Sequence, residues 1–221
     1  MNRYSIFSIL MITVLLLAGC GSNKSDSGSE TANSKQEKQV QEQQHKSDDN
    51  AAPPMLRNKA NRMSQLSTDQ VLEAALNGNL NIVSRAVENG FEVDATDQDG
   101  HTALMLAAYN GHSEIIRFLL DKGAVADARD HNNRTALMYA STGPFNTSVE
   151  MLLEAGADPN LVDNEEQFTP LMFAAAEGQT EVVKTLLKHG ADKTKVDVDG
   201  ESAYDFAVNN GHAEVAELVR P

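Results

Sequence analysis

The tetrapeptide Thr102-Ala103-Leu104-Met105 returns at a nearly constant interval along the second two-thirds of the chain. It recurs as Thr135-Ala136-Leu137-Met138, as Thr169-Pro170-Leu171-Met172 and, in weaker form, as Ser202-Ala203-Tyr204-Asp205. A glycine follows an apolar stretch on the same interval, at Gly90, Gly123, Gly156 and Gly190. A period of roughly 33 residues is typical of a solenoid, whose units bury their cores only against their neighbours. Because such a fold binds along an extended concave face, we expect recognition and not catalysis.

Each period predicts a helix, a turn, a second helix and a loop. In residues 101–123, Thr102 is placed to cap a helix that contains Leu104. Gly111-His112 interrupts this helix, and apolar residues then recur at helical spacing from Ile115 to Leu120. The glycine that follows suits the left-handed conformation at the end of a helix.

These strings resemble the ankyrin repeat, from about Asp69 to Arg220. The resemblance rests on 97–104 (Asp-Gln-Asp-Gly-His-Thr-Ala-Leu), 107–112 (Ala-Ala-Tyr-Asn-Gly-His) and 156–160 (Gly-Ala-Asp-Pro-Asn). It implies an all-α ankyrin-repeat solenoid of about five helix-turn-helix units with projecting β-hairpin fingers. The expected domain covers residues 67–221, with units at about 68–96, 97–129, 130–162, 163–196 and 197–221. Its first unit opens with a capping-box pattern from Ser67 to Gln70.

Two departures from the ankyrin pattern bear on function. Pro144-Phe145 replaces Gly-His in the middle unit, so the turn at 143–145 should follow a different path. The interval from Thr135 to Thr169 is 34 residues, which predicts one added residue within 163–168 at a fingertip. Insertions in repeat proteins fall in loops, often on the binding face.

The resemblance also implies a partner-binding surface, formed by the fingertips and the exposed side of each first helix. Tyr109, Arg134 and Phe168 have the residue types enriched at binding hot spots. Phe168 is the first candidate because its finger carries the insertion; the alternative is that its ring tucks under the longer finger. The expected set is Gln98, Asp99, His101, Tyr109, His131, Asn132, Arg134, Glu165, Glu166, Phe168, Glu177, Asp199 and Glu201.

Charge narrows the kind of partner. Residues 68–221 carry 10 basic and 26 acidic side chains, a net charge of −16 with histidine neutral. Such a field disfavours nucleic acid and anionic membrane surfaces, and it favours a protein partner with a basic surface. The alternative is that the acidic residues confer solubility only.

The N-terminus predicts export. Arg3 precedes an apolar run from Ile6 to Leu17, which is the layout of a secretory signal peptide over residues 1–19. The ending Leu17-Ala18-Gly19-Cys20 resembles the lipobox of bacterial lipoproteins. It implies cleavage before Cys20, lipidation of its thiol, and a position on the outer side of the cytoplasmic membrane. An uncleaved anchor helix and a buried cysteine are the alternatives.

Residues 20–66 predict a lipidated cysteine followed by a disordered polar linker. From Gly21 to about Pro54 the chain is almost free of apolar residues and cannot bury enough surface to fold. Residues 55–66 are ambiguous, because apolar Met55 and Met63 alternate with basic Arg57 and Arg62. This segment is expected to pack on the domain or to stay disordered, with contact to anionic lipid as the alternative.

No catalytic or cofactor chemistry is expected. The single cysteine is assigned to lipid, and no nucleophile elbow, phosphate loop or zinc-binding helix motif occurs. His112 and His212 occupy a position that bonds to backbone between ankyrin units, so they are expected to be structural. We expect a monomeric, membrane-anchored adaptor or scaffold without metal or cofactor. The alternative is an inhibitor or immunity protein that neutralises a toxin or cell-wall hydrolase in the envelope.

Overall fold

A computed structural model describes residues 66–221 of the chain. The predicted signal peptide, Cys20 and the predicted linker up to residue 65 lie outside these residues. No helix among the described residues is long and apolar enough to span a bilayer.

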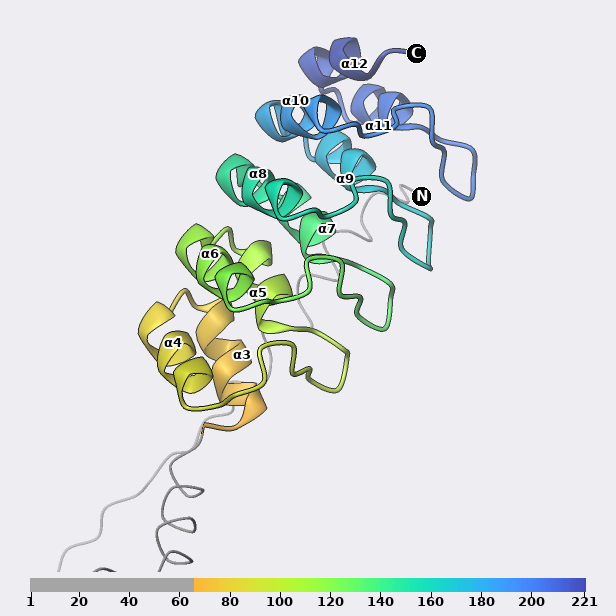
Figure 1. Cartoon of the computed structure of the whole chain (residues 1–221). Coiled ribbons are helices and arrows are strands. Elements are labelled where there is room, and N and C mark those ends of the chain that lie inside the picture. The colour runs from red at the N-terminus through yellow and green to blue at the C-terminus, as the bar shows by residue number, and fades with distance from the viewer. Residues whose placement is uncertain (1–65) are drawn as a thin grey trace, which may run out of the picture. The chain divides into compact units, whose positions relative to one another are not determined.

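The described residues form ten helices arranged as five antiparallel pairs (Figure 1). One row holds the first helix of each pair, and a second row holds its partner, while the connecting loops project beyond the first row. The predicted all-α solenoid is confirmed. The first row consists of α3 (Thr68–Leu76), α5 (Ala103–Tyr109), α7 (Ala136–Ser141), α9 (Pro170–Ala176) and α11 (Ala203–Asn209). The second row consists of α4 (Leu80–Glu88), α6 (Ser113–Asp121), α8 (Asn146–Glu154), α10 (Thr180–Lys188) and α12 (Ala213–Val219).

The recurring Thr/Ser of the sequence motif begins the later first-row helices. Thr102, Thr135, Thr169 and Ser202 each accept a hydrogen bond from the backbone N–H three residues on. In this way the side chain satisfies one of the N–H groups that a helix start leaves without a partner. The tetrapeptide therefore marks a helix start in four successive units.

Alanines let the first-row helices approach one another. Ala107, Ala108, Ala140, Ala174 and Ala175 are fully buried between neighbouring helices. Larger apolar side chains, among them Ile116, Leu152 and Leu186, are fully buried from the second row. The core is therefore continuous along the stack, as expected of units that bury apolar surface only against neighbours.

The two Gly-His turns behave as predicted. The Nε2 atom of His112 lies 2.9 Å from the carbonyl of Leu76, and that of His212 lies 3.1 Å from the carbonyl of Ala176. Each imidazole thus bonds to the backbone of the preceding unit, which confirms its structural role.

The middle turn takes a different path, as the Pro144-Phe145 substitution predicted. Gly111 has a φ of +69°, whereas Gly143 at the corresponding turn lies outside the left-handed region. The Phe145 ring fills the space over both glycines, since a Cβ on either would fall within 2.3 Å of it. An aromatic ring therefore replaces the imidazole at this one junction.

Candidate binding face

The four loops that project from the stack are the fingers of the sequence analysis. Among residues 66–221 they contain no strand; two isolated bridges, Thr96 with Thr102 and Val196 with Ser202, close the first and fourth. The hairpins are therefore short closed loops. A backbone hydrogen bond closes each of them, such as Asp130 N to Arg134 O at 3.1 Å.

The fingertips are joined to one another by backbone hydrogen bonds. His131 N donates to Asp99 O at 3.0 Å, Asn164 N to Asn132 O at 3.0 Å, and Val198 N to Glu166 O at 3.1 Å. These bonds fix the spacing between successive tips. Tip side chains therefore form one ordered row.

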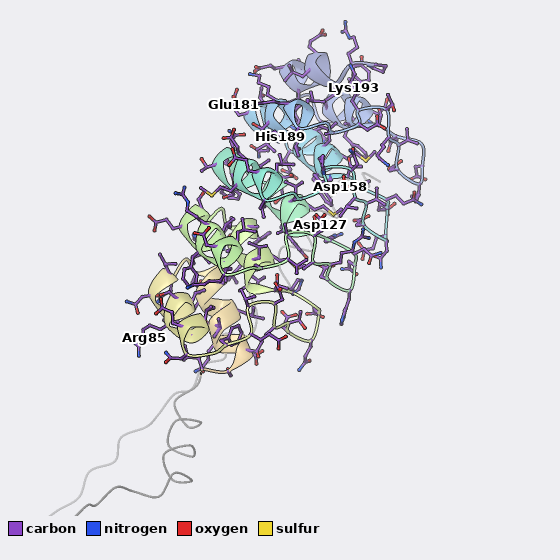
Figure 2. All side chains as sticks on the ribbon, in the orientation of Figure 1. Arg85, Asp127, Asp158, Glu181, His189 and Lys193 are labelled. Atoms are coloured by element: carbon purple, nitrogen blue, oxygen red, sulfur yellow. The ribbon has the colours of Figure 1, made fainter. Side chains whose placement is uncertain are left out.

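A second row of bonds joins the loops where they leave the helices. Figure 2 labels Asp127 and Asp158 on neighbouring loops. The Asp127 carboxylate accepts from Asp158 N at 3.1 Å, and Asp94 accepts from Val125 N at the same distance. Each finger is thus held at both its root and its tip.

An aspartate at the base of each finger organises the turn. The Oδ1 atom of Asp130 accepts from the backbone N–H of Asn132 and of Arg134, both at 2.8 Å. In the third finger Asp163 Oδ1 accepts from the backbone N–H of Glu166 at 3.2 Å and of Phe168 at 3.0 Å. Each of these donors is one residue further from its aspartate than the matching donor in the second finger. The third finger therefore contains the added residue between Asp163 and Phe168, as predicted.

The hydrogen bonds of the first finger change the pKa of the Asp97 carboxyl. Burial raises the pKa of its carboxyl, but hydrogen bonds from the His101 backbone and imidazole, with the charge of that ring, lower it. The net result is a pKa below the ordinary value for aspartate. The folded finger therefore favours the ionised carboxylate.

The residue just before each helix-capping Thr contacts the next unit. The His101 ring lies 6.0 Å from Tyr139, the Arg134 guanidinium 5.8 Å from the Phe173 ring, and the Phe168 ring 4.9 Å from Phe206. The contacted ring always belongs to the fourth residue after the next unit's Thr or Ser. We call these three pairs the inter-unit ring contacts; they were not predicted from the sequence.

Phe168 corrects the expectation that its ring faces a partner. Its side chain is only 6% exposed, and its ring packs edge-on against Phe173 at 5.5 Å as well as Phe206. The longer finger covers an apolar ring that links the fourth unit to the fifth. The alternative, a ring tucked under the finger, is the one that the structure has.

Arg134 is held by acidic groups of its own chain. Its Nε lies 3.4 Å from the buried Asp163 carboxylate and its NH2 lies 2.9 Å from Glu165. With its guanidinium also over the Phe173 ring, Arg134 joins the second finger to the third. Its side chain is 15% exposed, so it serves the stack more than the surface.

His101 occupies the same position one unit earlier. Its Nδ1 lies 2.9 Å from Asp97 and its Nε2 lies 3.8 Å from Asp130, whose side chain is 1% exposed. The imidazole therefore lies between the carboxylates of two successive fingers. Asp97, Asp99 and His101 also bring ligand-type atoms within 4.8 Å of one another, through bonds that form the finger turn itself.

Tyr139 completes this junction and was absent from the predicted set. Its hydroxyl donates to Asp130 Oδ2 at 2.6 Å, and its ring meets Tyr109 edge-on at 6.1 Å. Burial, together with the bond to Asp130, raises the tyrosine pKa well above its ordinary value. Tyr109 is half-buried on α5, where burial also raises its pKa. An aromatic residue four places after Thr135 was the signal available in the sequence.

Most of the remaining predicted residues lie at the surface. Glu177 is exposed at the C-cap of α9, whereas Asn132 and Glu201 are half-buried, Glu201 accepting from Asn209 Nδ2 at 3.2 Å. The exposed fingertip residues are Gln98, Asp99, His131, Glu165, Glu166 and Asp199.

The first-row helices carry acidic side chains and no basic ones. Within α3, α5, α7, α9 and α11 there is no lysine, arginine or histidine, while Asp69, Glu73 and Asp205 are acidic. A hydrogen bond from Ser202 holds the pKa of Asp205 below its ordinary value. The fingertips and the first-row helices together form what we call the acidic face.

A stack of helix pairs that presents a fixed row of fingers defines a repeat-type binding protein. The chain belongs to the ankyrin repeat family: the family model described as ankyrin repeats (3 copies) matches residues 71–163 and 146–220. The predicted resemblance to this family is confirmed. Ankyrin repeats are protein-protein interaction modules, so the chain's function at this level is to bind a protein.

Similarity to individual proteins is confined to a short stretch. The chain is 47% identical over 51 residues to ankyrin repeat family A protein 2 of Mus musculus, and 49% identical over 49 residues to the proteins of that name in Bos taurus and Homo sapiens. The matched stretch is 23% or 22% of this chain and 16% of each relative. It therefore supports the repeat and not a shared activity.

Proposed function

We propose that this chain is a lipid-anchored adaptor whose ankyrin domain captures a basic protein outside the cytoplasmic membrane. The observation that carries the binding part is the acidic face, where fixed fingertips and cation-free helices present carboxylates together. Arg134 of the second finger is already neutralised by Asp163 and Glu165. A partner with lysines or arginines would therefore meet net negative charge along the row.

Rigidity supports this proposal. Bonds at both root and tip hold the fingers in place before any partner arrives. A surface that is ordered in advance loses less conformational freedom on binding. Complementary charge accelerates encounter and opposes like-charged competitors. Association should therefore weaken as salt rises, because exposed charges are screened.

The anchor is the second part of the proposal, and it rests on the sequence Leu17-Ala18-Gly19-Cys20. Two or more acyl chains hold a protein on a membrane where one chain gives only reversible binding. Cys20→Ser removes the thiol, so we expect loss of lipid labelling together with either release from the membrane or stalled processing, measured by labelling and by fractionation of cells. Unchanged labelling of the Ser variant would contradict the anchor while leaving the binding module intact.

A second candidate is an inhibitor or immunity protein that covers a basic toxin or cell-wall hydrolase. The net charge of −16 over residues 68–221 favours it, because a strongly charged rigid face suits blocking a basic active-site cleft. The activity of the captured partner separates the two. An adaptor leaves that activity unchanged or raises it, whereas an inhibitor abolishes it at equimolar ratio.

The test is crosslinking in intact cells, followed by affinity capture and identification of the partner by mass spectrometry. The variant Glu166→Lys, Glu177→Lys reverses two exposed charges of the acidic face. We expect it to lose the partner that the unmodified chain captures. Equal capture by both would remove the acidic face from the interaction.

A further inference from the structure

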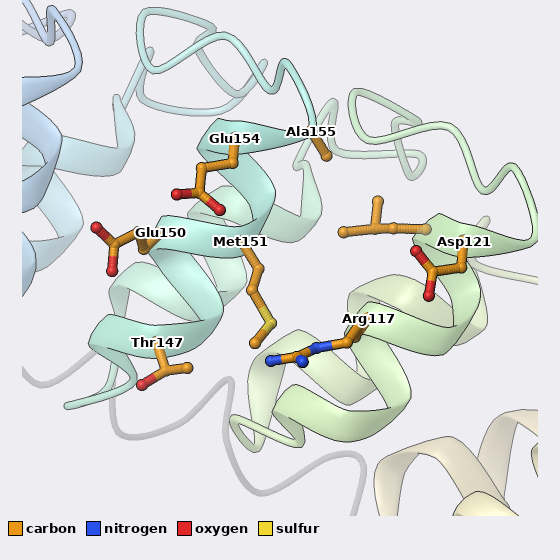
Figure 3. A pocket seen from close by; sticks show the side chains of 8 residues that line it. Arg117, Asp121, Thr147, Glu150, Met151, Glu154 and Ala155 are labelled. Carbon is orange, nitrogen blue, oxygen red and sulfur yellow. The ribbon is translucent and has the colours of Figure 1, made fainter.

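Away from the acidic face, a groove lies between the second-row helices α6 and α8 (Figure 3). It has a volume of about 580 Å³ and is open to solvent. Leu120, Met151 and Ala155 supply its apolar surface, and Asp121, Glu150 and Glu154 supply carboxylates. In Figure 3 Met151 of α8 and Arg117 of α6 point toward one another.

Few basic side chains neutralise the acidic groups of this groove. Arg117 is its only cation, so three carboxylates leave a net charge of −2. Between α8 and α10, Lys188 lies 3.7 Å from Glu150. Between α10 and α12, Lys184 lies 3.5 Å from Glu214. No such ion pair joins α6 to α8 within residues 66–221, and Asp121 and Glu154 are both exposed.

The chain itself contains a segment of complementary chemistry. Residues 55–65, which precede the described part, carry Arg57, Lys59 and Arg62 and no acidic residue. Their apolar side chains include Met55, Leu56 and Met63. The part of the segment far enough from Leu66 to reach the groove, residues 55–59, offers two cations and two large apolar groups to the carboxylates of Asp121 and Glu154 and to an apolar floor.

Chain length allows the segment to reach the groove. Eleven extended residues span at most roughly 36–40 Å. The segment joins the domain at Leu66, next to α3, and the groove lies between the second and third helix pairs. At about 10 Å between packed neighbouring helices, that separation along the stack is roughly 15–20 Å.

We propose that the first part of this segment, residues 55–59, docks in the α6–α8 groove, with Arg57 and Lys59 on Asp121 and Glu154 and with Met55 and Leu56 on Leu120 and Met151. The linker would then leave the domain from the second row, opposite the acidic face. This inference concerns a different surface from the proposed function and does not depend on it.

Disulfide trapping in the full mature chain tests the proposal. With Cys20→Ser removing the native thiol, Met55→Cys is paired with Thr147→Cys at the groove or with Ala213→Cys on α12, the last two being exposed positions. We expect efficient crosslinking to position 147 and little to position 213. Equal yields at the two positions would overturn the proposal.

Charge reversal supplies a matched control. Asp121→Lys, Glu154→Lys should lower the yield about tenfold through loss of two exposed ion pairs. Glu166→Lys, Glu177→Lys changes net charge equally on the acidic face and should leave the yield unchanged. Adding Arg57→Glu and Lys59→Glu to the groove variant should restore the crosslink.

Two outcomes contradict docking at this site. A yield that ignores the groove reversal would show that its carboxylates do not hold the segment. Absence of any crosslink, with residues 55–65 protected from protease only on anionic vesicles, would assign the segment to lipid. Because the charge reversals lie on exposed positions, unchanged unfolding midpoints should confirm that each variant is folded.

Discussion

Replacing Phe168 by alanine should destabilise the end of the stack and not merely weaken partner binding. The ring is 6% exposed and makes edge-on contacts at 4.9 Å with Phe206 and 5.5 Å with Phe173. Removing a buried phenylalanine costs about 3–5 kcal/mol, and each aromatic pair adds about 0.5–1.5 kcal/mol beyond burial. Since the ring lies between two units, we expect Phe168→Ala to lower the free energy of unfolding by about 3 kcal/mol.

That loss should be local. In a stack whose units contact only their neighbours, weakening one junction lowers the stability of whatever lies beyond it. Beyond the junction that Phe168 makes with Phe206 lie α11 and α12, the last helix pair. A cost of about 3 kcal/mol is a large part of the 5–15 kcal/mol that stabilises a typical domain, so the last pair should open first.

Amide hydrogen exchange across residues 203–219, with urea unfolding, measures this effect. Phe168→Ala should raise exchange there far more than in residues 103–121, and Phe168→Leu should restore most of the protection. Val198→Ala changes a nearby side chain that is 52% exposed and should alter stability by less than about 0.5 kcal/mol. Unchanged exchange in Phe168→Ala, together with lost partner capture, would refute the buried role.

Three further predictions concern other junctions. Tyr139→Phe leaves Asp130 without a close donor on Oδ2, so unfolding free energy should fall by about 1–3 kcal/mol at neutral pH. Because folding raises the Tyr139 pKa, that stability is present below the ordinary tyrosine pKa of about 10 and is lost as pH rises above it; between pH 8 and 11 the urea midpoint should therefore fall less in the Phe variant than in the unmodified chain. Asp97→Asn should remove stability that is present above pH 4 and lost as pH falls below it, because the Asp97 pKa is depressed; an acid unfolding curve that matches wild type would contradict this. Gly143→Ala places a Cβ 2.3 Å from the Phe145 ring and should destabilise by about 1–3 kcal/mol, whereas the same change with Phe145→Leu should cost less, as thermal melts would show.

The sequence was sufficient for the fold because repetition multiplies the signal. A capping Thr and two interhelical turns at fixed spacing leave few other ways to bury the apolar positions, and the structure has five helix pairs in that order. The middle turn and the lengthened third finger were also predictable, since each breaks an otherwise regular interval.

The binding residues were harder to predict because exposure depends on contacts between units. Phe168 and His101 occupy the same position in their repeats, yet the first meets an apolar ring and the second lies between carboxylates. What each touches is set by a residue about 38 places further along, Phe206 or Tyr139. The sequence pattern of a single repeat does not show which side chains of the next repeat will be in contact. Phe168 was therefore predicted to face a partner although its ring is buried, and Tyr139 was not predicted.

In the proposed function the acidic face, and no other part of the domain, binds a basic protein. The most direct test compares partner capture from intact cells by three chains: the unmodified protein, Glu166→Lys, Glu177→Lys, and Asp121→Lys, Glu154→Lys as the control of equal charge. We predict that one partner with a basic surface is lost only in the first variant, and that its binding weakens with salt. Loss in both variants alike, or in the control alone, would contradict the assignment of the binding face.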